Sequence, residues 1–200
     1  MYWEKPGKEN TEQTVALALE AAKAHGIRHI VVATTKGCTP DYFDGKLGDI
    51  KLTCVTHAYG SIFYGVNVLS DEKRASLLER GYQVCTAAHA LSAGERSISS
   101  LFKGNYPLEL MAQTLRMFGQ GTKVCVEIAA MAADAGMIPA GELVVAVAGT
   151  GAGADTAVIL RPSYSSSILD TRVEEMICKP LLGKPPVTPS PLAAHLPKKD

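Results

Sequence analysis

Hydroxyl groups, a lysine and a glycine gather directly after a short apolar run, Ile30–Ala33. The polar loop consists of Thr34, Thr35, Lys36, Gly37 and Thr39. Hydroxyls, backbone N–H groups and an ammonium group are the donors that hold a phosphate in proteins. Pro40 fits the first position of a helix with Thr39 as its N-cap, which would aim further free N–H groups at the same place. The pattern indicates an anion-binding loop, or else a strand-to-helix turn that binds nothing.

A second loop, rich in glycine, follows another apolar run at Glu142–Ala148. Its candidate binding residues are Gly149, Thr150, Gly151, Gly153 and Asp155. A dinucleotide fingerprint would continue into a helix, whereas Thr156–Leu160 reads as a strand, so a Rossmann site is not expected. The loop is expected either to line a ligand pocket with its N–H groups or to be a flexible connection between strands.

Two histidines also follow apolar segments that read as strands. His57 comes directly after Lys51–Thr56, and His89 comes shortly after Tyr82–Thr86. In open α/β sheets, ligands bind at the carboxyl ends of the strands, so all four features are expected at one edge. Each histidine could instead be an ordinary loop or core residue. No residue is assigned a catalytic role from the sequence.

The spacing of the remaining residues predicts alternating helices and strands. Helices are expected after Asn10 up to Gly26, at Pro40–Leu47, after Ser70 up to Arg80, from Pro107 to Phe118, and from Thr122 or Lys123 to Ala135. Strands are expected at 27–33, 51–56, 82–86, 142–148 and 156–160, with an edge strand at 172–178. This order predicts a three-layer α/β/α sandwich around a mainly parallel sheet. The link between strands 142–148 and 156–160 is too short for a crossover helix, which makes them antiparallel neighbours.

Charge and cysteine content narrow the function classes. The 20 basic and 20 acidic residues balance, so no basic field favours nucleic acid or an acidic membrane surface. No metal-ligand spacing appears, and no metal site is expected. The five cysteines form no C-x-x-C pair and are expected to be reduced thiols of a cytoplasmic protein. Glu127 lies four residues after Lys123, which favours a simple ion pair over a functional acid.

The composition changes near the end of the sequence. Six of the eleven prolines fall after Lys179. Residues 1–178 are therefore expected to form a single α/β domain, and residues 179–200 a proline-rich tail without a core of its own.

Several long motifs, in order along residues 10–180, resemble the C-terminal α/β domain of pyruvate kinase and a family of uncharacterised stand-alone proteins built on it. They lie at 15–39, 86–99, 115–127, 139–149 and 149–156. The resemblance implies that fold, with an antiparallel last strand, and flavin mononucleotide (FMN) as a ligand. Its phosphate would suit the Thr34–Thr39 loop or the Gly149–Asp155 loop. Ala152 stands where a basic residue is common in that family, which puts a charge contact at the second loop in doubt.

The resemblance does not imply pyruvate kinase activity, because the catalytic barrel of that enzyme is lacking. It favours a small protein that binds a phosphorylated molecule, FMN above all, for which flavin-dependent oxidoreduction is the corresponding activity. The alternative is a non-catalytic module that binds a phosphorylated metabolite as an effector. A structural oligomerisation domain is a third hypothesis, and a homo-oligomer is left open.

Overall fold

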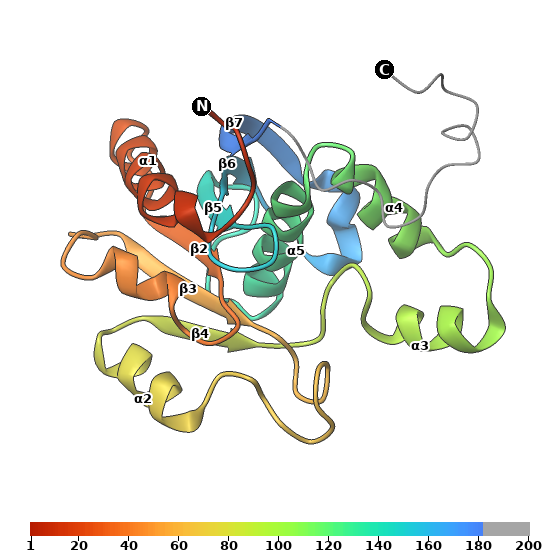
Figure 1. Cartoon of the computed structure of the whole chain (residues 1–200). Coiled ribbons are helices and arrows are strands. Elements are labelled where there is room, and N and C mark those ends of the chain that lie inside the picture. Colours follow the sequence, from red (N-terminus) through yellow and green to blue (C-terminus); the bar gives the residue numbers. More distant parts are fainter. Residues whose placement is uncertain (182–200) are drawn as a thin grey trace, which may run out of the picture.

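A seven-stranded sheet forms the centre of the protein (Figure 1). The computed structural model describes residues 1–181. The strands are β1 (Tyr2–Trp3), β2 (His29–Ala33), β3 (Lys51–Thr56), β4 (Gln83–Thr86), β5 (Val144–Ala148), β6 (Thr156–Arg161) and β7 (Arg172–Pro180). The helices are α1 (Thr11–Ala24), α2 (Asp71–Glu79), α3 (Ala93–Phe102), α4 (Pro107–Arg116) and α5 (Gln120–Asp134), with 3₁₀ helices η1 (Lys8–Asn10), η2 (Thr39–Phe43) and η3 (Ser165–Asp170). Across the sheet the strands follow the order β1-β7-β6-β5-β2-β3-β4.

Alternate residues of the central strands face opposite layers of helices. Ile30 and Val32 of β2 belong to the core cluster that contains Val15 and Leu19 of α1. Val31, between them, belongs to the cluster formed with α5. Figure 1 shows α1 and α5 on opposite sides of the sheet. This two-residue alternation confirms the three-layer sandwich.

Most of the sheet is parallel, and β6 is the strand that runs against it. β2 pairs in parallel with β3 on one side and with β5 on the other, and β3 pairs in parallel with β4. β6 pairs antiparallel with β5, as the short connection between them predicts. The last strand, β7, is in turn antiparallel to β6. The carboxyl ends of β2, β3, β4 and β5 therefore lie along one edge.

The structure corrects two expectations about the boundaries of elements. Instead of a helix over Pro40–Leu47, only the short 3₁₀ helix η2 forms. The strand expected at 172–178 continues as β7 to Pro180, because Lys179 and Pro180 pair with β1, a strand that was not expected. The remainder of the expected tail, 182–200, lies outside the described residues.

The cysteines are free thiols, and four of them are buried. Cys54 lies in β3, where burial raises the pKa of its thiol to about 12. Burial likewise raises the pKa of Cys85, Cys125 and Cys178. Buried thiols of this kind are unreactive, whereas Cys38 is exposed.

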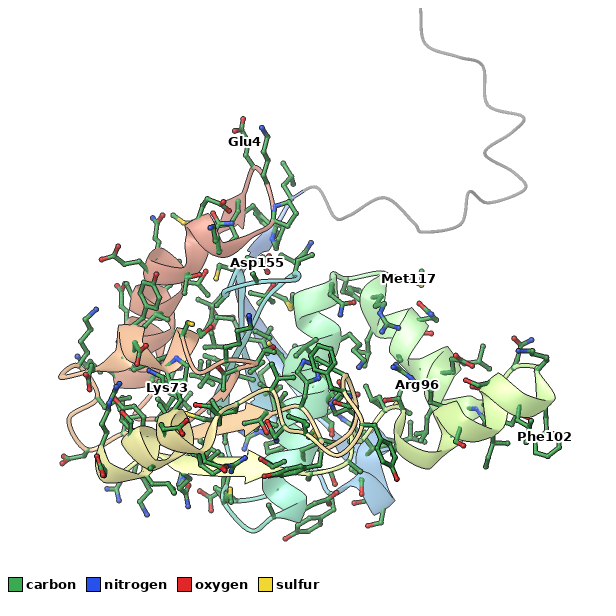
Figure 2. The ribbon with its side chains drawn as sticks, turned by 60° about the horizontal axis from the view of Figure 1, so that its bottom comes forward. Glu4, Lys73, Arg96, Phe102, Met117 and Asp155 are labelled. Atoms are coloured by element: carbon green, nitrogen blue, oxygen red, sulfur yellow. The ribbon has the colours of Figure 1, made fainter. Side chains whose placement is uncertain are left out.

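Helix α3 extends away from the sheet and buries none of its residues. Figure 2 shows Phe102 at its far end, pointing outward. Leu101 and Phe102 are 73% and 71% exposed, and Ile98 is also exposed. A helix of ten residues without a buried face lacks the packing that normally stabilises short helices. The apolar side chains of α3 thus stand apart from the core of the described chain.

We predict that Gly121→Ala destabilises the fold, because α5 packs against β6 at this glycine. A Cβ atom at Gly121 would collide with the buried side chain of Thr156, whereas one at Gly94 in α3 would meet nothing. Gly121→Ala should lower the free energy of unfolding by about 1–3 kcal/mol. The control Gly94→Ala should leave it unchanged or raise it by up to about 1 kcal/mol. Urea denaturation measures both, and equal stabilities of the two variants would contradict the predicted close packing.

Candidate functional site

A cavity of about 640 Å³ opens at the carboxyl edge of the sheet. Its walls come from the loops after β2, β3, β4 and β5, from one side of α5, and from the start of α1. Nine of the residues predicted from the sequence line it: Thr34, Thr35, Lys36, Thr39, His57, His89, Gly149, Gly151 and Gly153. The sheet thus brings both predicted loops and both histidines together, as their positions after parallel strands predict.

The first loop is tied to the neighbouring strand and closed on itself. The N–H of Thr34 donates to the carbonyl of Val55 over 2.9 Å, which continues the pairing of β2 with β3. The N–H of Gly37 donates to the hydroxyl oxygen of Thr34 over 3.0 Å. The hydroxyl of Thr34 therefore shapes the loop as well as facing the cavity.

The backbone conformation of the turn and the packing around it both account for Gly37. Its φ of 84° lies in the left-handed region, which favours glycine. A Cβ atom here would meet the side chains of Lys73 and Leu69, and Gly37 is not among the residues that line the cavity. The turn thus needs glycine for its backbone and for packing toward α2, and no close approach to a ligand is required to explain it.

The expected helix cap at Thr39 is also corrected. Thr39 lies inside η2, whose N-cap position is Cys38 and carries no side-chain hydrogen bond. A 3₁₀ helix of five residues offers little dipole to an anion. The positive charge of the cavity comes instead from two lysines, Lys36 of the loop and Lys8 of η1. Lys8 was not predicted as a site residue.

Asp155 holds the second loop in place and does not line the cavity. Its side chain is completely buried and accepts hydrogen bonds from the N–H groups of Gly7 and Thr150, each over 3.1 Å, and from the hydroxyl of Thr156 over 2.8 Å. Its carbonyl accepts a 2.7 Å bond from the indole N–H of Trp3. In Figure 2, Asp155 lies near the N-terminal segment that carries Glu4. Thr150 and Asp155 thus form the scaffold of the loop.

The glycines of the second loop allow its close packing. A Cβ atom at Gly149 would collide with the carbonyl oxygen of Gly153, and one at Gly153 would collide with Lys8 and Thr11. Thr11, at the start of α1, also accepts a 3.0 Å hydrogen bond from the N–H of Ala154. The loop is therefore packed against η1 and α1 and joined to α1 by a hydrogen bond.

The two histidines meet at another part of the cavity wall. Their ring centroids lie 5.2 Å apart, with the planes tilted by 46°. Burial lowers the pKa of both His57 and His89 below the ordinary value for histidine, and the carboxylate of Glu127 acts in the opposite direction. Both rings are therefore neutral at pH 7, where each can donate one hydrogen bond and accept another.

Glu127 forms the expected ion pair with Lys123 on the next turn of α5. Both side chains are almost fully buried, and burial lowers the pKa of Lys123 despite the opposing effect of Glu127. The other carboxylate oxygen accepts a 3.2 Å hydrogen bond from the N–H of Leu91. Glu127 also lines the cavity, so the pair brings a fixed carboxylate to the wall next to the histidines.

One stripe of α5 completes the wall, and Glu127 is the member of it that was considered from the sequence. It consists of Gln120, Val124, Glu127, Ile128 and Met131. These positions follow helical spacing, so one face of the helix points at the cavity. The signal that could have found them is the position of this helix directly before β5 together with that spacing.

The hydroxyl and ammonium groups that line the site are donors of the kind that suit an anion, and its imidazole rings are groups that can take up or release a proton. Within residues 1–181, no group of three or more His, Cys, Asp or Glu side chains is placed to hold a metal ion. No helix in the same part of the chain is long and apolar enough to cross a membrane.

Comparison with known proteins gives a family match and a similar solved structure. A sequence model described as "Pyruvate kinase, alpha/beta domain" matches residues 12–160. Among solved structures, pyruvate kinase of Cryptosporidium parvum in complex with ADP is similar, with 14% sequence identity and a TM-score of 0.35. The match covers 74% of this chain and 22% of that enzyme, so this chain spans only a small part of its length.

We predict that the scaffold role of Asp155 appears as a loss of stability. Asp155→Ala leaves the N–H groups of Gly7 and Thr150 buried without an acceptor, and should lower the free energy of unfolding by about 2–4 kcal/mol. Asp155→Asn keeps an oxygen for these donors and should cost about 1–2 kcal/mol. Chemical denaturation tests the order, which an equal loss in both variants would contradict.

Proposed function

The chain belongs to the family of the pyruvate kinase alpha/beta domain, and from this premise we propose that it binds a small phosphorylated molecule, with FMN as the preferred ligand. The observation that carries the proposal is the cavity, where two polar loops and two lysines converge at the carboxyl edge of a parallel sheet. The ligand would be held across β2 and β5, between the loops that follow them.

The first loop supplies most of the donors that a phosphate needs. Thr34, Thr35 and Thr39 place hydroxyl groups at the cavity, and Lys36 and Lys8 add two positive charges. Charge-assisted hydrogen bonds to a phosphate are about twice as strong as neutral ones, which favours a doubly charged group here. Ala152 also lines the cavity and brings no charge, so the cations come from the first loop and from η1.

The remainder of the cavity suits a flat aromatic group. Its volume lies in the range of sites for ligands of drug size. Apolar or aromatic lining comes from Val124, Ile128 and Met131 of α5, together with Val55 of β3 and Tyr42 of η2. When bound, FMN would supply hydride- and electron-transfer chemistry. A flavin-dependent oxidoreductase is the activity that this ligand would allow.

A different phosphorylated metabolite is the alternative ligand, with the protein acting as a non-catalytic effector-type module. In this proposal the Thr34–Thr39 loop contacts only the phosphate. It therefore gives no specificity for the group to which the phosphate is attached. Pyruvate kinase activity is not proposed, because residues 1–181 form only the α/β unit.

We predict that Lys36→Ala weakens FMN binding and leaves riboflavin binding unchanged. The variant loses one charged hydrogen bond to the phosphate, a loss of about 1.5–3 kcal/mol, whereas riboflavin carries no phosphate. Lys46→Ala, which removes an exposed lysine outside the cavity, is the matched control and should bind FMN like the wild type. Quenching of flavin fluorescence measures all affinities.

Three results would discriminate among the hypotheses about the ligand and its phosphate site. Equal affinity of the wild type for FMN and riboflavin would remove the phosphate from this loop. Binding of sugar phosphates without any FMN binding would favour the effector-type module. Equal losses in Lys36→Ala and Lys46→Ala would show that the effect of Lys36 is not local.

A further inference from the structure

His57 and His89 are brought together by the pairing of β3 and β4. Thr56 and Thr86, the last residues of these strands, pair in register, and their hydroxyl oxygens lie 2.7 Å apart. The chain continues from each strand into a histidine, and the rings meet with centroids 5.2 Å apart. Both rings line the same cavity. The pair is thus built into the sheet edge at the proposed ligand site.

Charges of both signs surround the histidine pair. Glu127 of α5 attracts a proton to both rings, whereas Lys123 of α5 and Arg96 of α3 oppose protonation of His89. The other charged or titratable groups on the cavity wall are Lys8, Lys36, Cys38 and Tyr42. From α2, Arg74 donates a 2.7 Å hydrogen bond to the hydroxyl of Thr86, next to the pair. Burial is the main reason why both rings stay neutral in the free protein, and for His89 the nearby cations add to its effect.

The pair favours holding one proton over holding two. A charge on His57 lowers the pKa of His89, because two like charges at this distance in a partly buried site repel each other. A neutral imidazole beside a protonated one can accept a hydrogen bond from it. One added proton would therefore be shared by the two rings.

We propose that the cavity binds its phosphorylated ligand together with one proton, which His57 and His89 share. The proposal rests on the proposed function, since the charge that draws the proton in is the dianionic phosphate. Together with Glu127, this charge favours the protonated form of the pair. The proton comes from solvent, so no other group changes its charge.

A dependence of affinity on pH follows from this linkage. The pKa of the pair is higher in the complex than in the free protein, so the complex holds more protons wherever the pH lies between the two values. Affinity for the dianion therefore rises as the pH falls through this window. Above the pKa of the complex, the proton is not taken up and the gain is lost.

Isothermal titration calorimetry with FMN tests the proposal. The titration is performed in two buffers of different ionisation enthalpy at about pH 7.5, where the phosphate is mainly dianionic since its second pKa is about 6. The wild type should take up a measurable fraction of one proton for each FMN bound. The uptake should remain in His57→Gln and in His89→Gln, because the other ring can hold the proton. It should disappear in the double variant.

His25→Gln is the matched control, because His25 lies at the end of α1, outside this cavity. Its proton uptake should equal that of the wild type. FMN binding without proton uptake, or the same uptake in the double variant as in the wild type, overturns the proposal and leaves the proposed function standing. Absence of FMN binding to the wild type overturns both.

A measurement on the wild type alone tests the proposal even if the double variant does not fold. NMR titration of the histidine ring resonances should show the pKa values of His57 and His89 rising when FMN is added. Unchanged ring pKa values in the complex would overturn the shared proton.

Discussion

The parallel pairing of β2 with β5 is the constraint on which the site depends. It places Ile30 beside Val145 and Val32 beside Val147, at the centre of the sheet. Because both strands end at the same edge, the loops that follow them meet there, one rich in hydroxyls and one rich in glycine. β3 and β4 extend this edge and add one histidine each. The helices α1 and α5 cover the two faces, so the cavity has walls from both layers.

A second constraint fixes the glycine-rich loop, and it is a buried charge. The carboxylate of Asp155 is held by backbone N–H groups from Gly7 and Thr150, and within residues 1–181 no cation is among its hydrogen-bond partners. An ionised group without water needs such donors, so the N-terminal segment and the loop cannot separate without exposing it. The indole of Trp3 binds the carbonyl of the same residue. The residues before α1 therefore belong to the frame of the site, although few of them face it.

The sequence predicts the elements that depend on local pattern. Apolar runs locate β2, β3 and β5, and the short link after β5 gives the antiparallel β6. Elements that form through contacts between distant residues are harder to predict from local pattern. β1 has two residues, and it is a strand because it pairs with β7. Asp155 looked like a ligand residue because it follows glycines, and only the packing of the N-terminal segment shows that it is enclosed. The i, i+4 spacing predicts the Lys123–Glu127 pair, but its place on the cavity wall follows from how α5 rotates against the sheet.

The central seam between β2 and β5 joins segments that are far apart in the chain, whereas β2, β3 and β4 follow one another closely. A molecule held between the two loops touches both sides of that seam, so any partial opening that parts these strands also destroys the binding surface. Occupancy then stabilises the closed sheet against this opening, by mass action, more than it stabilises the periphery. The amide hydrogens of β2 and β5 would exchange with solvent most slowly in the complex. The stability of the middle of the sheet, and not that of its rim, would therefore depend on whether the site is filled.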